Sequence, residues 1–277
     1  MLEHKFLDHD FGHSLDQIYS VFDGQNITNT EVHIQENCSV NPLFANTVSD
    51  IVYEKQIPLV YQVGWQTFMG VKIEVAPGAL VPREETELLG ATAVKVLSER
   101  GSGQRAIDMC CGSGNLACGV ASKIRDLRLW ASDLTDSTVQ LAGRNVKSLG
   151  LSSRVVVVQG DIFAGLSELA LEGNIDMVLC NPPYISTSRL AKDRAYLLDN
   201  EPREAFDGGP YGLSIHQRVI KEALPFLKPD GWLLFEIGLG QEKQLLHLFK
   251  RSKAYGEVQF AKDIFGVPRV ALAQRIG

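Results

Sequence analysis

The segment Asp108-Met109-Cys110-Cys111-Gly112-Ser113-Gly114-Asn115-Leu116-Ala117 is the strongest indication of the architecture, because it joins a short apolar run to a helix-forming run through two glycines. Residues 106–109 predict a buried strand and residues 115–123 predict a helix. Glycines let the backbone turn tightly and approach a ligand closely, and the first turn of a helix offers unpaired N–H groups. The spacing Gly112-x-Gly114-x-x-Ala117 fits the dinucleotide-binding fingerprint, and it also fits a plain glycine-rich turn.

Strand-like and helix-like runs alternate from residue 84 to the end of the chain. This order is typical of an α/β fold, in which helices cover a parallel sheet. Ser137 and Ser214 are expected to be helix N-caps. The expected strands are 106–109, 127–133, 155–160, 175–180, 231–238, 257–260 and 268–274, and the expected helices are 84–99, 115–123, 137–149, 213–227 and 241–251.

The chain before residue 83 has a different texture. Residues 1–55 show weak periodicity and predict a small N-terminal segment, partly helical at 16–22 and 45–55. Within residues 56–82 the apolar side chains alternate, as in Phe68-Met69-Gly70-Val71-Lys72-Ile73-Glu74-Val75, which predicts a connecting β-hairpin that turns near Met69 and Gly70. The main domain is then expected at residues 83–277.

The composition limits the class of protein. With 277 residues, 45% of them hydrophobic, the chain is long enough for one large α/β domain and a small companion. The net charge of −6 disfavours sequence-independent nucleic-acid binding, which depends on clustered Lys and Arg, and we expect no direct sequence-specific nucleic-acid binding. Apolar runs stay far below the roughly 18 residues of a membrane span, and residues 1–10 do not resemble a secretory signal. We therefore expect a cytoplasmic protein without membrane association.

The cysteines predict reduced thiols. Five is an odd number, and Cys110 and Cys111 are adjacent, which fits neither a disulfide framework nor a Cys-x-x-Cys zinc half-site. None of the six histidines stands beside a motif. We expect buried thiols and no metal site.

Acidic residues stand at or near three successive strand ends, at Asp108, Asp133 and Asp161. Ligands of such sheets bind beyond the carboxyl ends of the strands. Asp133 is well placed for a ribose hydroxyl, although it also suits the start of a helix. Asp161 and Ile162 are suited to an adenine ring. The carboxylate of Asp161 can accept a hydrogen bond from the adenine amino group, and the side chain of Ile162 can cover the ring. A dinucleotide-dependent dehydrogenase needs the glycine turn and Asp133 but not Asp161.

The fourth strand runs directly into Asn181-Pro182-Pro183-Tyr184. Two prolines remove two backbone donors and restrict φ, so the loop is rigid and presents a side-chain amide, free carbonyls and an aromatic ring. A proline pair that merely ends a strand is the alternative.

Together these motifs resemble the class I methyltransferases that use S-adenosyl-L-methionine, and within them the HemK/PrmC family of protein-(glutamine-N5) methyltransferases. The resemblance covers about residues 56–275. It implies a Rossmann-like seven-stranded sheet with a reversed final hairpin. The further segments that carry it include Val81-Pro82-Arg83-Glu84-Glu85-Thr86-Glu87, Glu201-Pro202-Arg203-Glu204-Ala205-Phe206-Asp207-Gly208-Gly209 and Phe235-Glu236-Ile237-Gly238.

The resemblance implies roles for the motif residues. The Asn181 side-chain oxygen and the Pro182 carbonyl are expected to accept the N–H groups of a substrate amide, and Tyr184 to stack on that amide. Pro183 and Arg83 are expected at the acceptor site, although a helix-start ion pair explains Arg83 equally well. The expected cofactor-binding residues are Asp108, Cys110, Gly112, Gly114, Asp133, Asp161, Ile162 and Asn181.

The leading acceptor is a protein glutamine, such as that of a peptide-chain release factor. An amide or amine of a small metabolite is the alternative, because residues 1–50 do not look like the usual helical N-terminal domain of the family. An NAD-dependent oxidoreductase is supported by the glycine turn alone.

Overall fold

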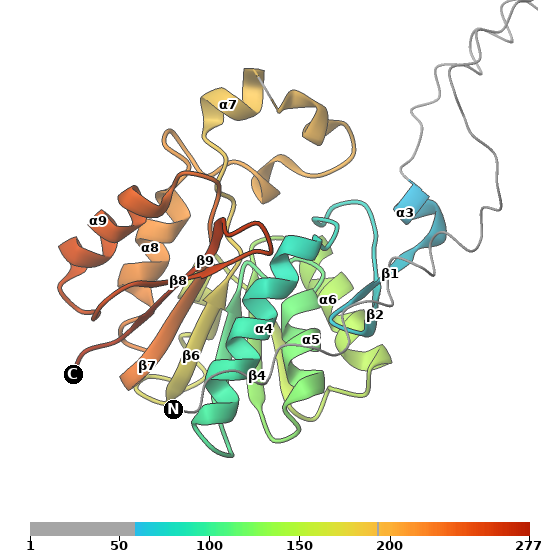
Figure 1. The fold of residues 1–277 in the computed structure, drawn as a ribbon. Helices are drawn as coiled ribbons and strands as arrows, with labels where there is room; N and C mark the ends of the chain where they lie inside the picture. The colour runs from blue at the N-terminus through green and yellow to red at the C-terminus, as the bar shows by residue number, and fades with distance from the viewer. Residues whose placement is uncertain (1–58, 193) are drawn as a thin grey trace, which may run out of the picture. The chain divides into compact units, whose positions relative to one another are not determined.

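A seven-stranded sheet forms the centre of the described part of the chain (Figure 1). The computed structural model describes residues 59–192 and 194–277. The helices expected at 16–22 and 45–55 lie outside these residues, so the division of the chain at residue 55 stays a prediction. No helix of the described ranges is long and apolar enough to cross a membrane.

The sheet has the strand order β5-β4-β3-β6-β7-β9-β8. Its first five strands are parallel, β9 runs antiparallel to β7, and β8 runs antiparallel to β9. The predicted α/β fold with a mostly parallel seven-stranded sheet and a reversed final hairpin is therefore confirmed. The strands are β3 (Arg105–Met109), β4 (Arg128–Asp133), β5 (Val155–Gln159), β6 (Ile175–Cys180), β7 (Leu227–Glu236), β8 (Gln259–Lys262) and β9 (Pro268–Gln274).

Two apolar cores lie on the two faces of the sheet, because consecutive residues of a buried strand point to opposite sides. On β6, Met177 and Leu179 join the core under α4, α5 and α6, whereas Val178 and Cys180 join the core under α8 and α9. Figure 1 shows α8 beside α9 and α4 beside α5. These helices are α4 (Glu84–Glu99), α5 (Asn115–Lys123), α6 (Asp136–Ser148), α8 (Ser214–Glu222) and α9 (Glu242–Ser252).

A hairpin and a small helical insertion flank this body. Strands β1 (Trp65–Phe68) and β2 (Val71–Glu74) pair antiparallel around a turn at Met69 and Gly70, where the alternation predicts it, and α3 (Leu59–Val63) precedes them. The segment between β6 and α8, at the top of Figure 1, carries short helices. They are α7 (Thr187–Lys192), η2 (Ala195–Asp199) and η3 (Arg203–Ala205), while η1 (Ile162–Leu166) follows β5.

Both predicted N-caps are wrong. Thr135 caps α6, since its backbone is extended and its Oγ1 accepts the N–H of Thr138 at 3.3 Å, whereas Ser137 lies inside the helix. Ser214 is the first residue of α8, and Leu213 occupies the cap position without a side-chain hydrogen bond. Several hydroxyl residues stand close together at the start of α6, and only the backbone angles select the one that caps.

Some predicted boundaries also shift. The helix expected at 213–227 ends at Glu222, because a turn follows and Leu227 begins β7 beside Ile175. The strand expected at 231–238 is therefore longer at its start, and the strand expected at 257–260 lies two residues later. Buried apolar residues satisfy a helical and an extended pattern alike, so local periodicity does not separate the two.

Candidate functional site

The loop between β3 and α5 contains three residues in the left-handed region. Cys110, Gly112 and Gly114 have φ values of 59°, 55° and 75°. A Cβ on Gly114 would lie 3.0 Å from the Cβ of Ala142, whereas a Cβ on Gly112 would enter open space. Glycine at 114 therefore allows α5 and α6 to approach each other, and glycine at 112 leaves room for a ligand.

Asp108 and Asp133 bind the backbone of this loop. The Oδ2 atom of fully buried Asp108 accepts the N–H of Ala117 at 2.9 Å. The Oδ2 atom of Asp133 accepts the N–H of Gly112 at 2.8 Å, and its Oδ1 atom accepts the Thr138 hydroxyl at 2.8 Å. The two carboxyl groups therefore hold the loop at the ends of β3 and β4.

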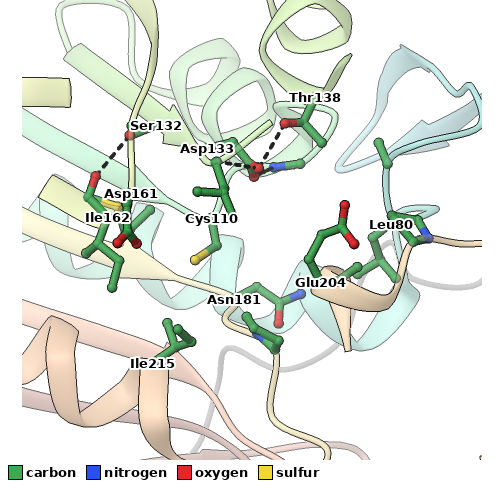
Figure 2. A pocket seen from close by; sticks show the side chains of 18 of the residues that line it. Leu80, Cys110, Ser132, Asp133, Thr138, Asp161, Ile162, Asn181, Glu204 and Ile215 are labelled. Atoms are coloured by element: carbon green, nitrogen blue, oxygen red, sulfur yellow. Dashed lines mark hydrogen bonds between the residues drawn. The ribbon is translucent and has the colours of Figure 1, made fainter. Parts of the chain in front are cut away.

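One cavity of about 740 Å³, its open mouth included, lies at the carboxyl ends of the parallel strands. Figure 2 shows the side chains of Cys110, Asp133 and Asn181 around it. Of the predicted site residues, the cavity is lined by Cys110, Gly112, Asp133, Asp161, Ile162, Asn181 and Pro183, but not by Arg83, Asp108, Gly114, Pro182 or Tyr184.

Asp161 has a cationic partner that the motifs did not indicate. Its carboxylate pairs with Arg218 of α8 at 2.8 Å, and both side chains are exposed. The next residue, Ile162, has a φ of 55°, and its carbonyl accepts the Ser132 hydroxyl at 3.1 Å. This hydrogen bond fixes the turn that places Asp161 and Ile162 in the cavity wall.

Asn181 follows β6 and is held by buried hydroxyl and carboxyl groups. Its Nδ2 donates to Oγ1 of Thr86 at 3.2 Å, and the Thr86 hydroxyl donates to Oε2 of Glu236 at 2.6 Å. The Tyr184 hydroxyl donates to Oε1 of Glu236 at 3.3 Å. Thr86 and Glu236 are each only 1% exposed, so water does not compete for these contacts. The Asn-Pro-Pro-Tyr motif is thereby tied to α4 and to the end of β7.

Burial changes the titration of these groups. It raises the pKa of Glu236 to about 7, and the hydrogen bond from the Thr86 hydroxyl opposes that rise. Burial also raises the pKa of Tyr184 far above its ordinary value, and the charge of Glu236 adds to the effect. Glu236 therefore titrates near neutral pH, while Tyr184 keeps its proton.

Arg83 precedes α4 and forms an ion pair there, but its partner is not the nearby Glu85. It pairs with Glu201 at 2.5 Å, and the same carboxylate accepts the N–H of Val81 at 2.8 Å. Glu85 pairs instead with Arg269 of β9 at 3.5 Å. Arg83 thus joins the start of α4 to the segment before η3.

Sequence reasoning gave no role to Thr86, Glu236 or Arg218. Thr86 and Glu236 stand in segments that carry the family resemblance, and Glu236 ends an apolar strand as Asp133 does. An acid at a buried strand end is therefore the available signal for Glu236. Arg218 lies in the middle of an amphipathic helix, and its sequence context offers no signal.

The thiols only partly follow the prediction. Cys111, Cys118 and Cys180 are buried and unpaired, as expected, but Cys110 is partly exposed in the cavity wall. Cys38 lies outside the described residues. Within residues 59–192 and 194–277 there is no group of three or more His, Cys, Asp or Glu side chains that could hold a metal ion.

Comparison with solved structures supports this fold. A methyltransferase from Pyrococcus furiosus aligns with 84% of this chain and 100% of its own, at a TM-score of 0.53 and 20% identity. The hMettl16 catalytic domain, solved with the MAT2A 3'UTR hairpin 1, aligns with 85% of this chain and 92% of its own, at a TM-score of 0.55 and 18% identity. At these identities the likeness shows the fold alone.

Comparison of sequences confirms the resemblance. Residues 86–205 match the model of the Methyltransferase small domain. The release factor glutamine methyltransferase of Thermodesulfovibrio yellowstonii is 30% identical over 245 residues, which cover 87% of this chain and 85% of the relative. That of Moorella thermoacetica is 36% identical over 218 residues, or 79% of this chain and 75% of the relative. Since these matches run through the glycine loop and the Asn-Pro-Pro-Tyr motif, the chain belongs to the family of release factor glutamine methyltransferases.

Proposed function

We propose that this protein transfers a methyl group from S-adenosyl-L-methionine to the side-chain amide nitrogen of a glutamine in a peptide-chain release factor. The observation that carries the proposal is that Asn181 lines the same cavity as Gly112 and Asp133. A donor group bound by the glycine loop and an amide bound by Asn181 would therefore meet. We place this activity in the cytoplasm, where release factors act.

The cavity residues fit S-adenosyl-L-methionine. A carboxylate has about four acceptor positions. Asp133 uses three of them, for the N–H groups of Gly112 and Leu134 and the hydroxyl of Thr138, and so keeps one on Oδ2 for a ribose hydroxyl. Ile162 and Ile215 give the wall apolar surface for a planar ring. The open space at the Cβ position of Gly112 lets a ligand approach the backbone.

The chain's own residues solve the problem of a poor nucleophile. The cofactor supplies an electrophilic methyl group on a sulfonium. The amide nitrogen of glutamine has its lone pair delocalised into the carbonyl, so it must be aligned and shielded from water. We assign the acceptance of its N–H groups to the Asn181 side-chain oxygen and the Pro182 carbonyl, which favours the positive charge that develops on nitrogen. Tyr184 would then cover the face of the amide.

Replacing Asn181 tests the proposal. Asn181→Ala should lower kcat for a release factor or a Gly-Gly-Gln peptide by about 10²–10³, the scale for the loss of one preorganised polar contact. Cofactor affinity, measured by calorimetry, should change much less. Asn174→Ala is the matched control, because Asn174 lies in an exposed loop and its side chain donates to the backbone carbonyl of neighbouring Glu172. A wild-type rate in Asn181→Ala would refute the mechanism, and methylation of a metabolite but no peptide would refute the acceptor.

Asp133→Ala should weaken the binding of S-adenosyl-L-methionine by about 1–3 kcal/mol, because partners of a charged hydrogen bond are left unmatched. Asp136→Ala is the control, since Asp136 is a nearby exposed residue in the first turn of α6 and accepts a hydrogen bond from Gln140. Equal affinity in the two variants, by calorimetry, would remove Asp133 as the ribose ligand.

The family relatives favour a protein acceptor over a metabolite and over an oxidoreductase reaction.

A further inference from the structure

The buried chain Asn181–Thr86–Glu236 does more than join three elements. Its hydrogen bonds can be donated in one direction or the other, and that direction determines which end of the Asn181 amide faces the cavity. The amide has a donor end and an acceptor end, and only the acceptor end can bind a substrate N–H. The inference below rests on the proposed function, since it concerns the same methyl transfer.

The charge state of Glu236 sets the direction of these hydrogen bonds. An ionised carboxylate only accepts hydrogen bonds. The 2.6 Å distance between Oγ1 of Thr86 and Oε2 of Glu236 is typical of a charge-assisted O–H···O⁻ bond, so Thr86 donates its single proton there. Oγ1 of Thr86 then has lone pairs but no proton for Asn181. The amide NH₂ of Asn181 must therefore point at Thr86, and its Oδ1 must point the other way.

The second oxygen of Glu236 serves the same motif. Oε1 accepts the hydroxyl of Tyr184, the last residue of Asn-Pro-Pro-Tyr. Both oxygens of one buried carboxylate are thus used to orient the side chains at the two ends of the motif. Thr86 and Glu236 are each only 1% exposed, so neither is accessible to the substrate.

We infer that Glu236 is a positioning residue for methyl transfer, which acts through Thr86 to turn the Asn181 carbonyl oxygen toward the acceptor amide. A protonated Glu236 can donate to Thr86, which frees the Thr86 proton for Asn181 and favours the opposite orientation of the amide. Glu236 has to be ionised for the productive orientation.

Several charged groups surround Glu236. Glu85 of α4 raises its pKa, and Arg269 of β9 lowers it. His216 of α8 contacts the Glu236 backbone carbonyl at 3.2 Å through Nε2, and burial lowers its pKa to about 4, so it stays neutral above that pH. With Tyr184 protonated, Glu236 is the group of this cluster that titrates near pH 7. Turnover should therefore rise with pH through about 7 and then level off.

Variants of the two buried residues test the inference. Glu236→Gln keeps the shape but offers one acceptor oxygen in place of two, so kcat should fall by roughly 10–100-fold, the equivalent of one charged hydrogen bond. The rise in kcat near pH 7 should disappear, while the KM for the cofactor stays the same. Thr86→Val should give the same fall in kcat, and Thr86→Ser should restore wild-type turnover. Thr92→Val is the matched control on α4, because the Thr92 hydroxyl donates to the carbonyl of Leu88 in its own helix.

A second readout needs neither cofactor nor acceptor. In the free protein, the side-chain ¹H–¹⁵N amide signals of Asn181 are identified by their loss in Asn181→Ala. They should move in Glu236→Gln and Thr86→Val, and stay in place in Thr86→Ser and Thr92→Val. If Glu236→Gln does not fold, the two Thr86 variants decide the question alone.

The inference is overturned if the Asn181 signals stay in place in both Glu236→Gln and Thr86→Val, or if Glu236→Gln keeps the wild-type kcat and pH profile. A wild-type protein that methylates no acceptor would refute the proposed function, and the amide signals would still decide the orientation of Asn181.

Discussion

Asp108 shows how burial sets the state of a single residue. It is fully buried, its Oδ2 accepts the Ala117 N–H, and its Oδ1 has no hydrogen-bond partner in the described part of the chain. Burial raises its pKa to about 8. The folded protein therefore keeps Asp108 protonated near pH 7, where an unfolded chain would ionise it. This residue supports the glycine loop without adding charge to the site.

The pH dependence of stability tests this state. The Asp108 carboxyl has a raised pKa in the folded protein, so its contribution to stability is full below about pH 4 and is lost as pH rises toward 8. Asp108→Asn does not titrate. The free energy of unfolding of the variant should therefore rise relative to that of the wild type between pH 5 and pH 8, by at most about 1.4 kcal/mol per pH unit. A constant difference in urea unfolding across this range would mean that Asp108 is ionised in the folded state.

At the scale of elements, the turn of the β1–β2 hairpin depends on the helices beneath it. Met69 and Gly70 both have positive φ, a pair of positions that favours Asn-Gly. Met69 is retained by its packing, because its sulfur occupies the space left by Gly90 of α4 and Gly119 of α5. Its backbone N–H also donates to Glu87 at 2.6 Å. One side chain thus joins the hairpin to two helices.

Met69→Ala should lower the free energy of unfolding by about 1–3 kcal/mol, below the full cost of a buried methionine because Met69 is only partly buried. Thr67→Ala on the exposed face of β1 should cost much less. Both are measured by urea unfolding with the wild type beside them. Equal costs for the two variants would show that the sulfur contributes nothing to the joint.

At the scale of the whole molecule, the strand order creates the site. β3 lies between β4 and β6, so the chain leaves β3 toward one edge of the sheet and later returns to its other side. Such a switch point leaves a crevice at the carboxyl ends of the strands. The cavity that contains Asp133 and Asn181 lies there. The two apolar cores hold its walls from opposite faces of the sheet.

A ligand that binds this cavity only in the folded state should stabilise the whole protein. S-adenosyl-L-methionine at 100-fold above its Kd should add about 2.7 kcal/mol, and for a chain of this size each kcal/mol raises Tm by roughly 2–4 °C. NAD and the metal chelator EDTA should leave Tm unchanged, since we predict neither a dinucleotide site nor a bound metal. A larger rise in Tm with NAD than with S-adenosyl-L-methionine, measured in a thermal scan, would favour the oxidoreductase hypothesis.

The elements that depend on local sequence pattern could be predicted before the fold was known. The apolar run 175–180 predicts β6 and the glycine loop predicts the start of α5, because strand periodicity and the left-handed backbone of glycine are local properties. The order of these elements was enough to predict the α/β class and the end of the sheet where the site lies. It also singled out Asp133 and Asn181, which the structure brings to one cavity.

The hydrogen-bond and ion-pair partners of the site residues depend on how the chain folds. Asn181 meets Thr86 across 95 residues of chain, and Thr86 meets Glu236 across 150. Ionic partners such as Arg218 for Asp161 follow the same rule. A hydrogen bond or an ion pair depends on distance in space, and separation along the chain carries no information about it until the strand order is set. The protonation of Asp108 and Glu236 depends likewise on burial, which is a property of the assembled core.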